Sequence, residues 1–250
     1  MADPKERFST RAGNYARYRP GYPRAILEEL SAKYDFTPSF VVADVASGTG
    51  LLSELFLENG NRVFGVEPND EMREAGERYL AGYPLFESVS GTAEETTLHK
   101  ESVDLVVVGH AFHWFDVPKA RAEFGRILRP AGYAALLWNE LKHDASPFMD
   151  AYERLIRRHK THRYEDFDRR EGIRAFFNPE PYEERVFRHS QNFDLDGLRG
   201  RLLSSSYVSD EGRPGYEDMM CELKDVFRTH ARDGKIVFEY ETLVYIGRLG

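Results

Sequence analysis

Acidic residues and glycines follow two short apolar runs in the first third of the chain, and their spacing suits the binding of a nucleoside. The first run contains Asp44 and leads into a turn with Gly48 and Gly50, and the second run ends beside Glu67. A glycine turn lets the backbone approach a ligand where any Cβ would collide. A carboxylate at the end of the second run can accept hydrogen bonds from both hydroxyls of a ribose. A strand, a glycine turn, a helix and a second strand that ends in a carboxylate therefore predict a nucleoside-binding crevice.

Asp44 bears on the kind of nucleoside that this crevice would take. Its position before Gly48 places the carboxylate at the end of a strand, where it would repel a pyrophosphate and attract an ammonium group. This favours a ligand with a cationic amino-acid portion over one with phosphates. The alternatives are that Asp44 only bonds the amides of the turn, and that Glu67 is a helix cap or a surface acid ahead of Pro68.

Two further places along the chain are candidates for contact with the base of a nucleoside. Met72 can pack on an adenine face, although a lone methionine here is more often part of a core. In the segment 91–94, a small residue leaves room for an adenine, and Thr92 or backbone amides can bond its edge. Glu94 has a simpler alternative, which is to begin a helix.

Histidines and aromatic residues follow the fourth apolar run, at His110, Phe112, His113, Trp114 and Phe115. Ligands of open α/β sheets bind at the carboxyl ends of strands, and histidine changes its charge near neutral pH. We expect Trp114 or Phe115 to lie in the core and His110 or His113 to face the crevice. The alternative is local packing of the aromatic residues under the next helix. Neither paired cysteines nor a helical pair of histidines accompanies them, so no metal site is predicted.

Apolar runs alternate with helical stretches up to about residue 138. We expect strands at 41–45, 62–66, 85–89, 103–108 and 133–138, and helices at 24–34, 51–59, 70–81 and 118–128. Short, continuously apolar strands separated by helices indicate a parallel sheet that is covered on both faces. The later pattern predicts helices at 146–160, 194–205 and 215–231, and strands at 184–193 and 235–247. The predicted fold is α/β, with a seven-stranded, mostly parallel sheet, an antiparallel last strand and a helical cap inserted before it.

Composition narrows the class of function. The chain has 250 residues and a net charge of −8, which argues against a general grip on nucleic acid because such proteins usually carry a basic stripe. Cys221 is the only cysteine, so no disulfide can form within the chain and a cytoplasmic location is expected. The N-terminal residues do not resemble a signal peptide, and no apolar run approaches the roughly 18 residues that span a bilayer. We expect an enzyme that acts on a small molecule, as a monomer or homodimer, without nucleic-acid or membrane partners.

The segment 154–170 is strongly charged and contains seven Arg or Lys residues. One interpretation is that it attracts an anionic substrate. The other is a solvated helix face.

Taken together, these residues resemble the class I S-adenosylmethionine-dependent methyltransferases. Residues 41–50 resemble the first motif of that family, 63–72 its ribose-binding motif, 91–94 its adenine-edge motif and 126–132 the turn before its fifth strand. The most similar subgroup contains the trans-aconitate methyltransferase-like proteins, within the type 11 methyltransferases. The segments that resemble it run from Tyr15 to Pro23 and from Phe112 to Phe115, and the whole resemblance covers about residues 8–140.

The resemblance implies S-adenosyl-L-methionine as cofactor and a single Rossmann-like domain over 1–250. Within it, 1–40 would be an N-terminal cover, 41–138 the cofactor-binding core, 139–183 and 194–234 the cap and insertions, and 184–193 and 235–247 the final strands. His113 and His110 are the catalytic candidates, with His110 close to the sulfonium. Tyr15, Tyr18 and Arg19 would form the cover, and Arg19 would meet a carboxylate of the cofactor or substrate bidentately. The implied cofactor-binding residues are Arg19, Asp44, Ala46, Gly48, Gly50, Glu67, Pro68, Met72, Thr92, Ala93, Glu94 and His110.

The chain departs from the family pattern at four places. Ala46 stands where the first glycine is usual, and alanine fits a tight turn if its φ is negative. Gly109 and His110 stand where Ala-Gln is common, Ala131 replaces a glycine, and Thr92 holds a place often taken by Asp or Gly.

The resulting interpretation is methyl transfer to a small molecule, with O-methylation of a carboxylate among the reactions considered. A carboxylate needs no base at neutral pH, whereas a phenol, an alcohol or a protonated amine does, and His113 is the candidate base. One alternative is an NAD(P)-dependent oxidoreductase, because residues 48–53 also match a dinucleotide fingerprint; Asp44 and the turn at 128–130 argue against it. The other is a non-catalytic protein that binds a nucleoside cofactor.

Overall fold

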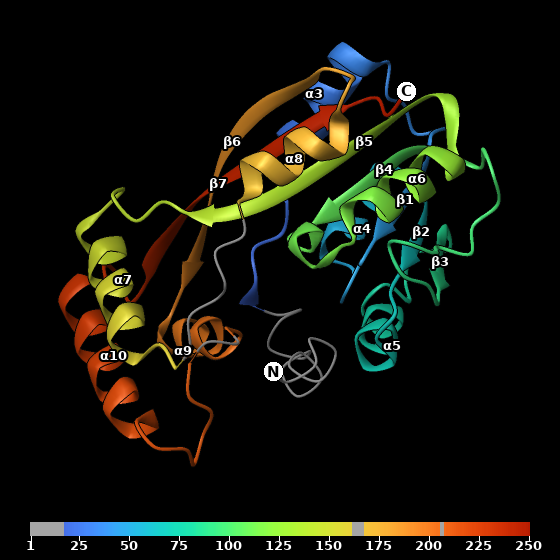
Figure 1. Cartoon of the computed structure of the whole chain (residues 1–250). Coiled ribbons are helices and arrows are strands. Elements are labelled where there is room, and N and C mark those ends of the chain that lie inside the picture. Colours follow the sequence, from blue (N-terminus) through green and yellow to red (C-terminus); the bar gives the residue numbers. More distant parts are fainter. Residues whose placement is uncertain (1–17, 162–167, 206–207) are drawn as a thin grey trace. The chain divides into compact units, whose positions relative to one another are not determined.

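The computed structural model describes residues 18–161, 168–205 and 208–250, and its elements follow the alternating order that the sequence predicts (Figure 1). The elements of the first half are α3 (Ala25–Tyr34), β1 (Val41–Val45), α4 (Leu51–Glu58), β2 (Arg62–Val66), α5 (Asp70–Tyr79), β3 (Phe86–Val89), β4 (Val103–Gly109), the 3-10 turn η1 (Phe112–Trp114) and α6 (Val117–Ile127). Those of the second half are β5 (Leu128–Leu141), α7 (Pro147–His159), α8 (Arg169–Phe177), β6 (Tyr182–Phe193), α9 (Leu195–Leu203), α10 (Tyr216–His230) and β7 (Ile236–Gly247).

Seven strands form one sheet in the order β3-β2-β1-β4-β5-β7-β6. The strands β1 to β5 pair in parallel, and the register places Asp44 opposite Gly65 on one side and Val107 on the other. In Figure 1, β7 runs against β5 and β6, so the last strand is antiparallel. The α/β fold with a mostly parallel seven-stranded sheet is therefore confirmed. Since the parallel strands end at one edge of the sheet, Asp44, Glu67 and Gly109 come to the same side.

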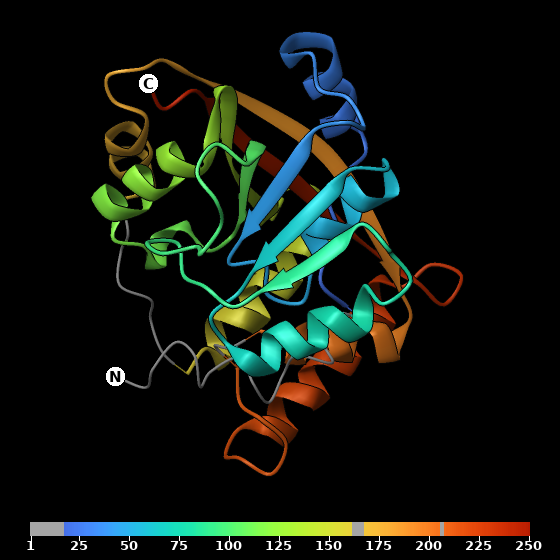
Figure 2. The same cartoon turned by 90° about the vertical axis from the view of Figure 1, so that its right-hand side faces the viewer.

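Each face of the sheet is covered by its own helices, as the continuously apolar strands predict (Figure 2). Successive residues of a strand point to opposite faces, so Val42 packs with α3 and α4 while Ala43 packs with α6 and α8. Phe56 on the first face and Phe124 on the second are completely buried. Burying a side chain of this size contributes about 1.5–3 kcal/mol, so the two layers hold the strand ends firmly in place.

Contacts divide the chain into two units, which we name by content. The sheet unit comprises residues 21–139, 166–187 and 242–250, and the helical unit comprises residues 1–20, 140–165 and 188–241. The helical unit has its own core where α7, α9 and α10 pack with β7, with Tyr152 and Phe238 fully buried. The apolar face predicted for α7 is thus the face that packs.

The helix α8 is the element that the sequence pattern missed. It lies at the end of the strongly charged segment, which hid the spacing of Ile173, Phe176 and Phe177, all completely buried. Asp168 caps the helix by accepting a hydrogen bond from the amide of Glu171 at 3.0 Å. The fifth strand is also longer than the predicted 133–138, since β5 starts directly at Leu128.

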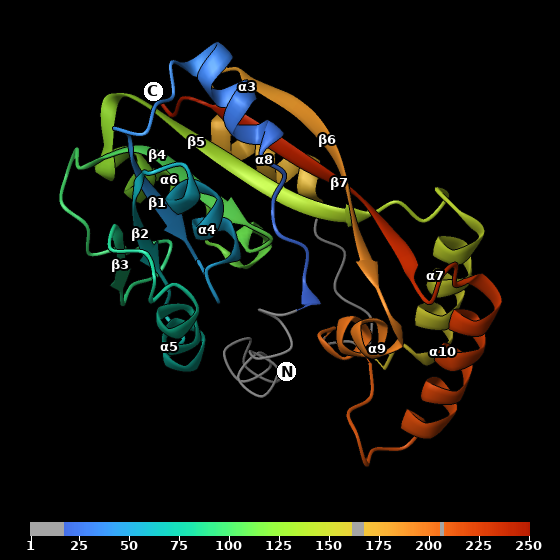
Figure 3. The same cartoon turned by 180° about the vertical axis from the view of Figure 1, so that it is seen from behind.

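The helix α3 lies beside the edge strand β6 (Figure 3), and charged and polar side chains join the two elements. Arg185 donates to Glu29 at 2.7 Å, and the Tyr34 hydroxyl donates to Glu183 at 3.2 Å. Both bonds lie within the sheet unit. Across the described parts of the chain, no helix has the length and apolar character to cross a membrane.

Candidate functional site

The turn after β1 is built on left-handed backbone at three positions. The φ angles are +58° at Ala46, +57° at Gly48 and +85° at Gly50, and the amide of Gly50 donates to the Ser47 carbonyl at 2.9 Å. A Cβ on Gly50 would lie 2.5 Å from Leu80 Cδ1, and one on Gly48 would lie 3.3 Å from Met72 Cε. The positive φ favours glycine at both positions, and a Cβ at Gly50 would also force Leu80 to move.

Ala46 corrects one expectation. Alanine was expected to fit the turn with a negative φ, but its φ is +58°. This region places an alanine Cβ too close to the following carbonyl and costs about 1–2 kcal/mol. The turn therefore keeps the shape that a glycine would give it, and the alanine carries backbone strain.

Glu67 follows the last residue of β2 and ties the glycine turn to the start of α5. One carboxylate oxygen accepts the amide of Gly48 at 2.9 Å, and the other accepts the amide of Asn69 at 2.9 Å. The side chain is only 7 % exposed. The carboxylate therefore fixes the turn relative to the start of α5, and its contact with ribose hydroxyls stays a prediction.

Asp44 lies at the end of β1 and is 1 % exposed. Its Oδ2 accepts a hydrogen bond from the Ser53 hydroxyl at 2.7 Å, while Oδ1 is buried with no hydrogen-bond partner among the described residues. Burial raises the pKa of Asp44 to about 7, and the nearby charge of Glu67 adds to the increase. A cationic group beside Oδ1 would relieve both effects.

Residues 68–72 form the start of α5 and follow directly from Glu67. Asn69 caps the helix by accepting the amide of Met72 at 2.9 Å, and Pro68 precedes the cap. Met72 is 7 % exposed and lies against the turn through its Cε. The helix start therefore positions Met72 beside the glycine turn, and its contact with an adenine stays a prediction.

The segment 91–94 forms a loop after β3 and begins no helix, so the alternative interpretation of Glu94 is wrong. The Thr92 amide donates to the Glu95 carbonyl at 3.0 Å, and the Thr92 hydroxyl accepts the Glu95 amide at 3.1 Å. Ala93 is 4 % exposed, and a Glu94 oxygen accepts the amide of Asp116 at 2.9 Å. Local turn bonds and a tie to the start of α6 thus define the shape of this loop.

His110 directly follows β4 and has a left-handed backbone with φ of +60°. Its Nε2 accepts the backbone amide of Asn139 at 2.8 Å, a bond that requires a neutral ring with its proton on Nδ1. The side chain of Asn139 accepts from Thr242 at 2.5 Å and donates to the Gly21 carbonyl at 3.1 Å. This network fixes the ring, and a proton-accepting role through Nε2 would require that bond to break.

Gly109 explains a departure from the family pattern, because a Cβ at this position would collide with the Tyr22 hydroxyl.

His113 follows in η1 with its ring 4.5 Å from that of Trp114, and burial lowers its pKa below 6.5. The expectation for the aromatic residues holds for Phe115, which packs against the core, whereas Trp114 is 42 % exposed. A neutral imidazole at His113 is suited to accept a proton near pH 7.

Arg19 and Tyr18 belong to the helical unit, whereas the other predicted cofactor residues belong to the sheet unit. Arg19 donates to the Ser204 carbonyl at 3.1 Å, and the Tyr18 ring covers Gly200 so closely that a Cβ there would collide with it. Tyr15, the other member of the predicted cover, lies outside the described residues. The assignment of Arg19 to the cofactor stays a prediction.

The charged segment at the end of α7 pairs its arginines with carboxylates. Arg157 bonds Glu153 at 2.5 Å and is 75 % exposed, and Arg158 bonds Glu222 of α10 at 2.8 Å and is 65 % exposed. Both pairs are solvated, which favours the interpretation as a helix face over a steering patch.

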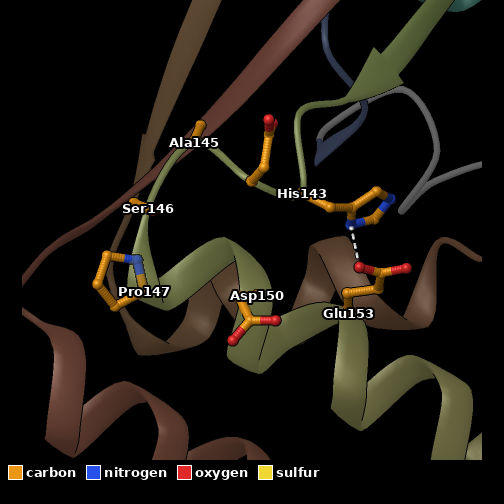
Figure 4. A pocket seen from close by; sticks show the side chains of 7 residues that line it. His143, Ala145, Ser146, Pro147, Asp150 and Glu153 are labelled. Atoms are coloured by element: carbon orange, nitrogen blue, oxygen red, sulfur yellow. Dashed lines mark ion pairs between the residues drawn. The ribbon is translucent and has the colours of Figure 1, made fainter.

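A hollow of about 560 Å³ lies at the start of α7 (Figure 4). Its wall contains His143, Asp150 and Glu153, and the His143 ring faces Glu153 with 3.7 Å between nitrogen and oxygen. All of these residues lie in the helical unit, and none is a predicted site residue. Over the described ranges, no group of three His, Cys, Asp or Glu side chains is placed to hold a metal ion.

Sequence reasoning missed several polar residues at the strand ends. Ser53 bonds Asp44, Asn69 bonds both Glu67 and Met72, and Asn139 bonds His110. Ser53 had a detectable signal, because helical spacing places this polar residue on one face of α4 with the buried Phe56 and Leu57. The contacts of Asn139 join β5 to β4, β7 and the segment before α3, and no local pattern predicts them.

Comparisons with known proteins agree with this geometry. The family model described as "Methyltransferase domain" matches residues 43–136. An uncharacterized methyltransferase of Schizosaccharomyces pombe is 24 % identical over 90 % of this chain and 88 % of that protein. One of Mycobacterium tuberculosis is 37 % identical over 53 % of this chain, which spans about half, 51 %, of the mycobacterial protein. A solved structure of a candidate type II methyltransferase from Anaeromyxobacter dehalogenans has a TM-score of 0.70 at 22 % identity and covers 93 % of this chain and 98 % of that chain.

The residues at the strand ends fit S-adenosylmethionine, whose sulfonium carries an activated methyl group. The buried Asp44 Oδ1 suits its ammonium group, the Glu67 carboxylate at the end of β2 suits its ribose hydroxyls, and the turn at Gly48 and Gly50 admits a close approach of the backbone. The family match favours this cofactor over a nicotinamide, so the hydride-transfer alternative is not supported. Residues 43–136 therefore match a methyltransferase domain, and the residues at its strand ends fit S-adenosylmethionine as the methyl donor.

Proposed function

We propose that the chain methylates a small molecule, with a carboxylate oxygen as acceptor. The observation that carries the first part is the joint arrangement of Asp44, Glu67 and the glycine turn at one sheet edge, which suits the methyl donor. The net charge of −8 supports a small acceptor over nucleic acid. The resemblance to trans-aconitate methyltransferase-like proteins supports the carboxylate.

The histidines at the end of β4 bear on the acceptor class. The Nε2 of His110 is engaged by the Asn139 amide, so His113 is the better candidate for a base. A carboxylate acceptor is already ionised at neutral pH and needs no base, whereas a phenol does. The two acceptor classes therefore differ in how strongly they depend on His113.

The test is a panel of carboxylic acids, phenols and amines, with formation of S-adenosylhomocysteine and of methylated product as readouts. Wild type and His113→Asn are compared at pH 7. We expect carboxylate methylation to change less than about threefold in the variant, and any phenol methylation to fall by about 100-fold or more. Absence of transfer to every acid, with transfer to a phenol or amine, would contradict the carboxylate proposal.

The cellular location, the oligomeric state and the partners of the protein are also proposals. A reducing, cytoplasmic environment is supported by Cys221, the single cysteine of the chain, which is exposed and would be open to oxidation elsewhere. A monomer or homodimer without nucleic-acid or membrane partners is proposed on the acidic composition, and sedimentation at several concentrations would test the oligomeric state.

A further inference from the structure

The helix α6 carries a carboxylate that holds the loop after β3 from behind. Glu123 is 8 % exposed, and the residue that it bonds, Thr96, is completely buried. One oxygen of Glu123 accepts the Thr96 amide at 2.8 Å and the Thr96 hydroxyl at 2.5 Å. A single residue of the loop therefore gives both of its donors to one ionised oxygen, an arrangement that fixes position strongly.

Arg126, one turn further along α6, completes this anchor. Its guanidinium donates to both oxygens of Glu123 at 2.7 Å and also to the Leu98 carbonyl at 2.8 Å. Arg126 is the main reason that the pKa of Glu123 is lowered to about 2, against the opposing effect of burial. The helix thus holds the loop at two points, Thr96 and Leu98.

The residue between those two points is strained. Thr97 has a φ of +64°, which is unfavourable for a β-branched residue. Such a backbone persists only where the surroundings over-determine it, and here Thr96 and Leu98 are both bonded to α6. The shape of this loop is therefore imposed by Glu123 and Arg126 and is not its own local preference.

The position of Thr96 also constrains the segment 91–94, which is predicted to contact the base of the cofactor. A Cβ on Gly91 would lie 2.8 Å from the Thr96 carbonyl oxygen, so the backbones at these residues are in close contact. The Thr92 amide is bonded to the Glu95 carbonyl next to Thr96 at 3.0 Å. A displacement of Thr96 would therefore move Gly91 and Thr92 as well.

We propose that Glu123 is a positioning residue for the adenine of the cofactor, acting through Thr96 on the loop 91–94. The inference rests on the assignment of this loop to the adenine edge. Glu123 touches neither the cofactor nor the acceptor in this role. Its removal should weaken binding of the adenine and leave recognition of the ribose and the amino acid unchanged.

The chain offers a matched control at the beginning of β4, the end of that strand opposite to the predicted site. Asp104 also accepts a backbone amide, that of Val41 at 2.8 Å, and also pairs with an arginine, Arg129, at 2.5 Å. It lies at the beginning of β4, whereas the predicted site lies where the strand ends. Asp104→Asn therefore removes a similar carboxylate anchor without touching the loop.

The test is calorimetric titration of the full chain with S-adenosylhomocysteine, and with S-ribosylhomocysteine, which lacks the base. We expect Glu123→Gln to weaken binding of S-adenosylhomocysteine about tenfold and that of S-ribosylhomocysteine less than twofold. Asp104→Asn should change neither by more than about twofold. An equal loss for both ligands, or no loss for either, would overturn the proposal.

A second variant keeps the proposal testable if Glu123→Gln does not fold. Thr96→Val removes the hydroxyl donor, keeps the backbone amide and preserves the shape of the side chain. We expect it to weaken binding of S-adenosylhomocysteine about threefold, again without effect on S-ribosylhomocysteine. If wild type itself does not bind S-adenosylhomocysteine, the cofactor assignment fails, which is a different result from an insensitive Glu123.

Discussion

Two glutamates of the sheet unit and two of the helical unit illustrate two uses of a carboxylate. In the sheet unit, Glu67 and Glu123 are nearly buried and accept backbone amides of loops near the strand ends. In the helical unit, Glu153 and Glu222 pair with arginines that are mostly exposed. A buried carboxylate bonded to backbone fixes a conformation, whereas a solvated pair gains little because water competes for both charges. Charge alone therefore does not locate a site in this chain, but the partners of each carboxylate do.

Of the substitutions considered, Asp44→Asn is expected to change the stability of the chain most. The pKa of Asp44 is raised by burial from 3.8 to about 7, so between these pH values the folded chain keeps a proton that the unfolded chain has released. Asp44 therefore lowers the free energy of unfolding progressively as the pH rises through this window. The loss reaches about 4 kcal/mol above pH 7. Asparagine does not ionise, so the stability of the variant relative to wild type should increase from pH 4 to pH 7 and then level off.

Urea unfolding at pH 4 to 8 measures this difference. Asp150→Asn serves as control, because Asp150 is an exposed carboxylate of α7, and a change below about 1 kcal/mol is expected there. The same substitution at Asp44 should weaken binding of S-adenosylhomocysteine if the carboxylate meets its ammonium group. A stability difference that is constant across this pH range would show that Asp44 does not carry the burial penalty.

Glu67→Gln is expected to have the next largest effect on stability, and it should destabilise the chain, whereas Asp44→Asn should stabilise it. One oxygen becomes an amide nitrogen that faces a backbone amide, either that of Gly48 or that of Asn69. The unfolding free energy should fall by about 2–3 kcal/mol, and the affinity for S-adenosylhomocysteine by about 100-fold. Chemical denaturation and titration calorimetry measure the two quantities.

The control for this prediction is Glu222→Gln in the helical unit. Glu222 accepts Arg158 and lies 2.8 Å from His159, and both partners are side chains, of which Arg158 is mostly exposed. A loss below about 1 kcal/mol and no change in cofactor affinity are expected. Equal losses at the two glutamates would remove the contrast between the units.

Ala46→Gly is expected to stabilise the chain, although glycine usually costs stability. The φ of Ala46 is +58°, so relief of about 1–2 kcal/mol of strain exceeds the entropy that glycine loses on folding. We expect a net gain of about 0.5–1 kcal/mol. Ala75→Gly within α5 should instead lose about 1 kcal/mol, and a loss at both positions in thermal unfolding would contradict the reported turn conformation.

The turn at Ala46 also illustrates what the sequence could and could not predict. Alternating runs and helical spacing predicted the succession of strands and helices along the chain and most element boundaries to within a few residues, because periodicity is a local property. The same local signals identified Asp44, Gly48 and Glu67. They did not give the sign of φ at Ala46, because the family pattern and the residue type favour opposite answers.

Two of the residues that sequence reasoning missed act over long distances in the chain. Asn139 bonds His110 and Thr242, and Glu123 bonds Thr96, so each contact exists only once the sheet has formed. The helix α8 was missed for a different reason, since charges around it masked a short apolar face. Local patterns therefore identified the candidate cofactor residues, and the tertiary fold was needed to find what holds them.

The smallest effect is expected for the pair that joins α7 to α10. Arg158 bonds Glu222 at 2.8 Å, with the arginine side chain 65 % exposed. A double-mutant cycle with Arg158→Ala and Glu222→Ala should give a coupling free energy below about 1 kcal/mol that falls further in 1 M salt. The neutralised pair should also leave the KM of any accepted acid unchanged. A coupling that survives high salt, or a KM that rises several-fold for acids alone, would mean that the charged end of α7 contributes to acceptor binding and that the helical unit has a charge-based site of its own.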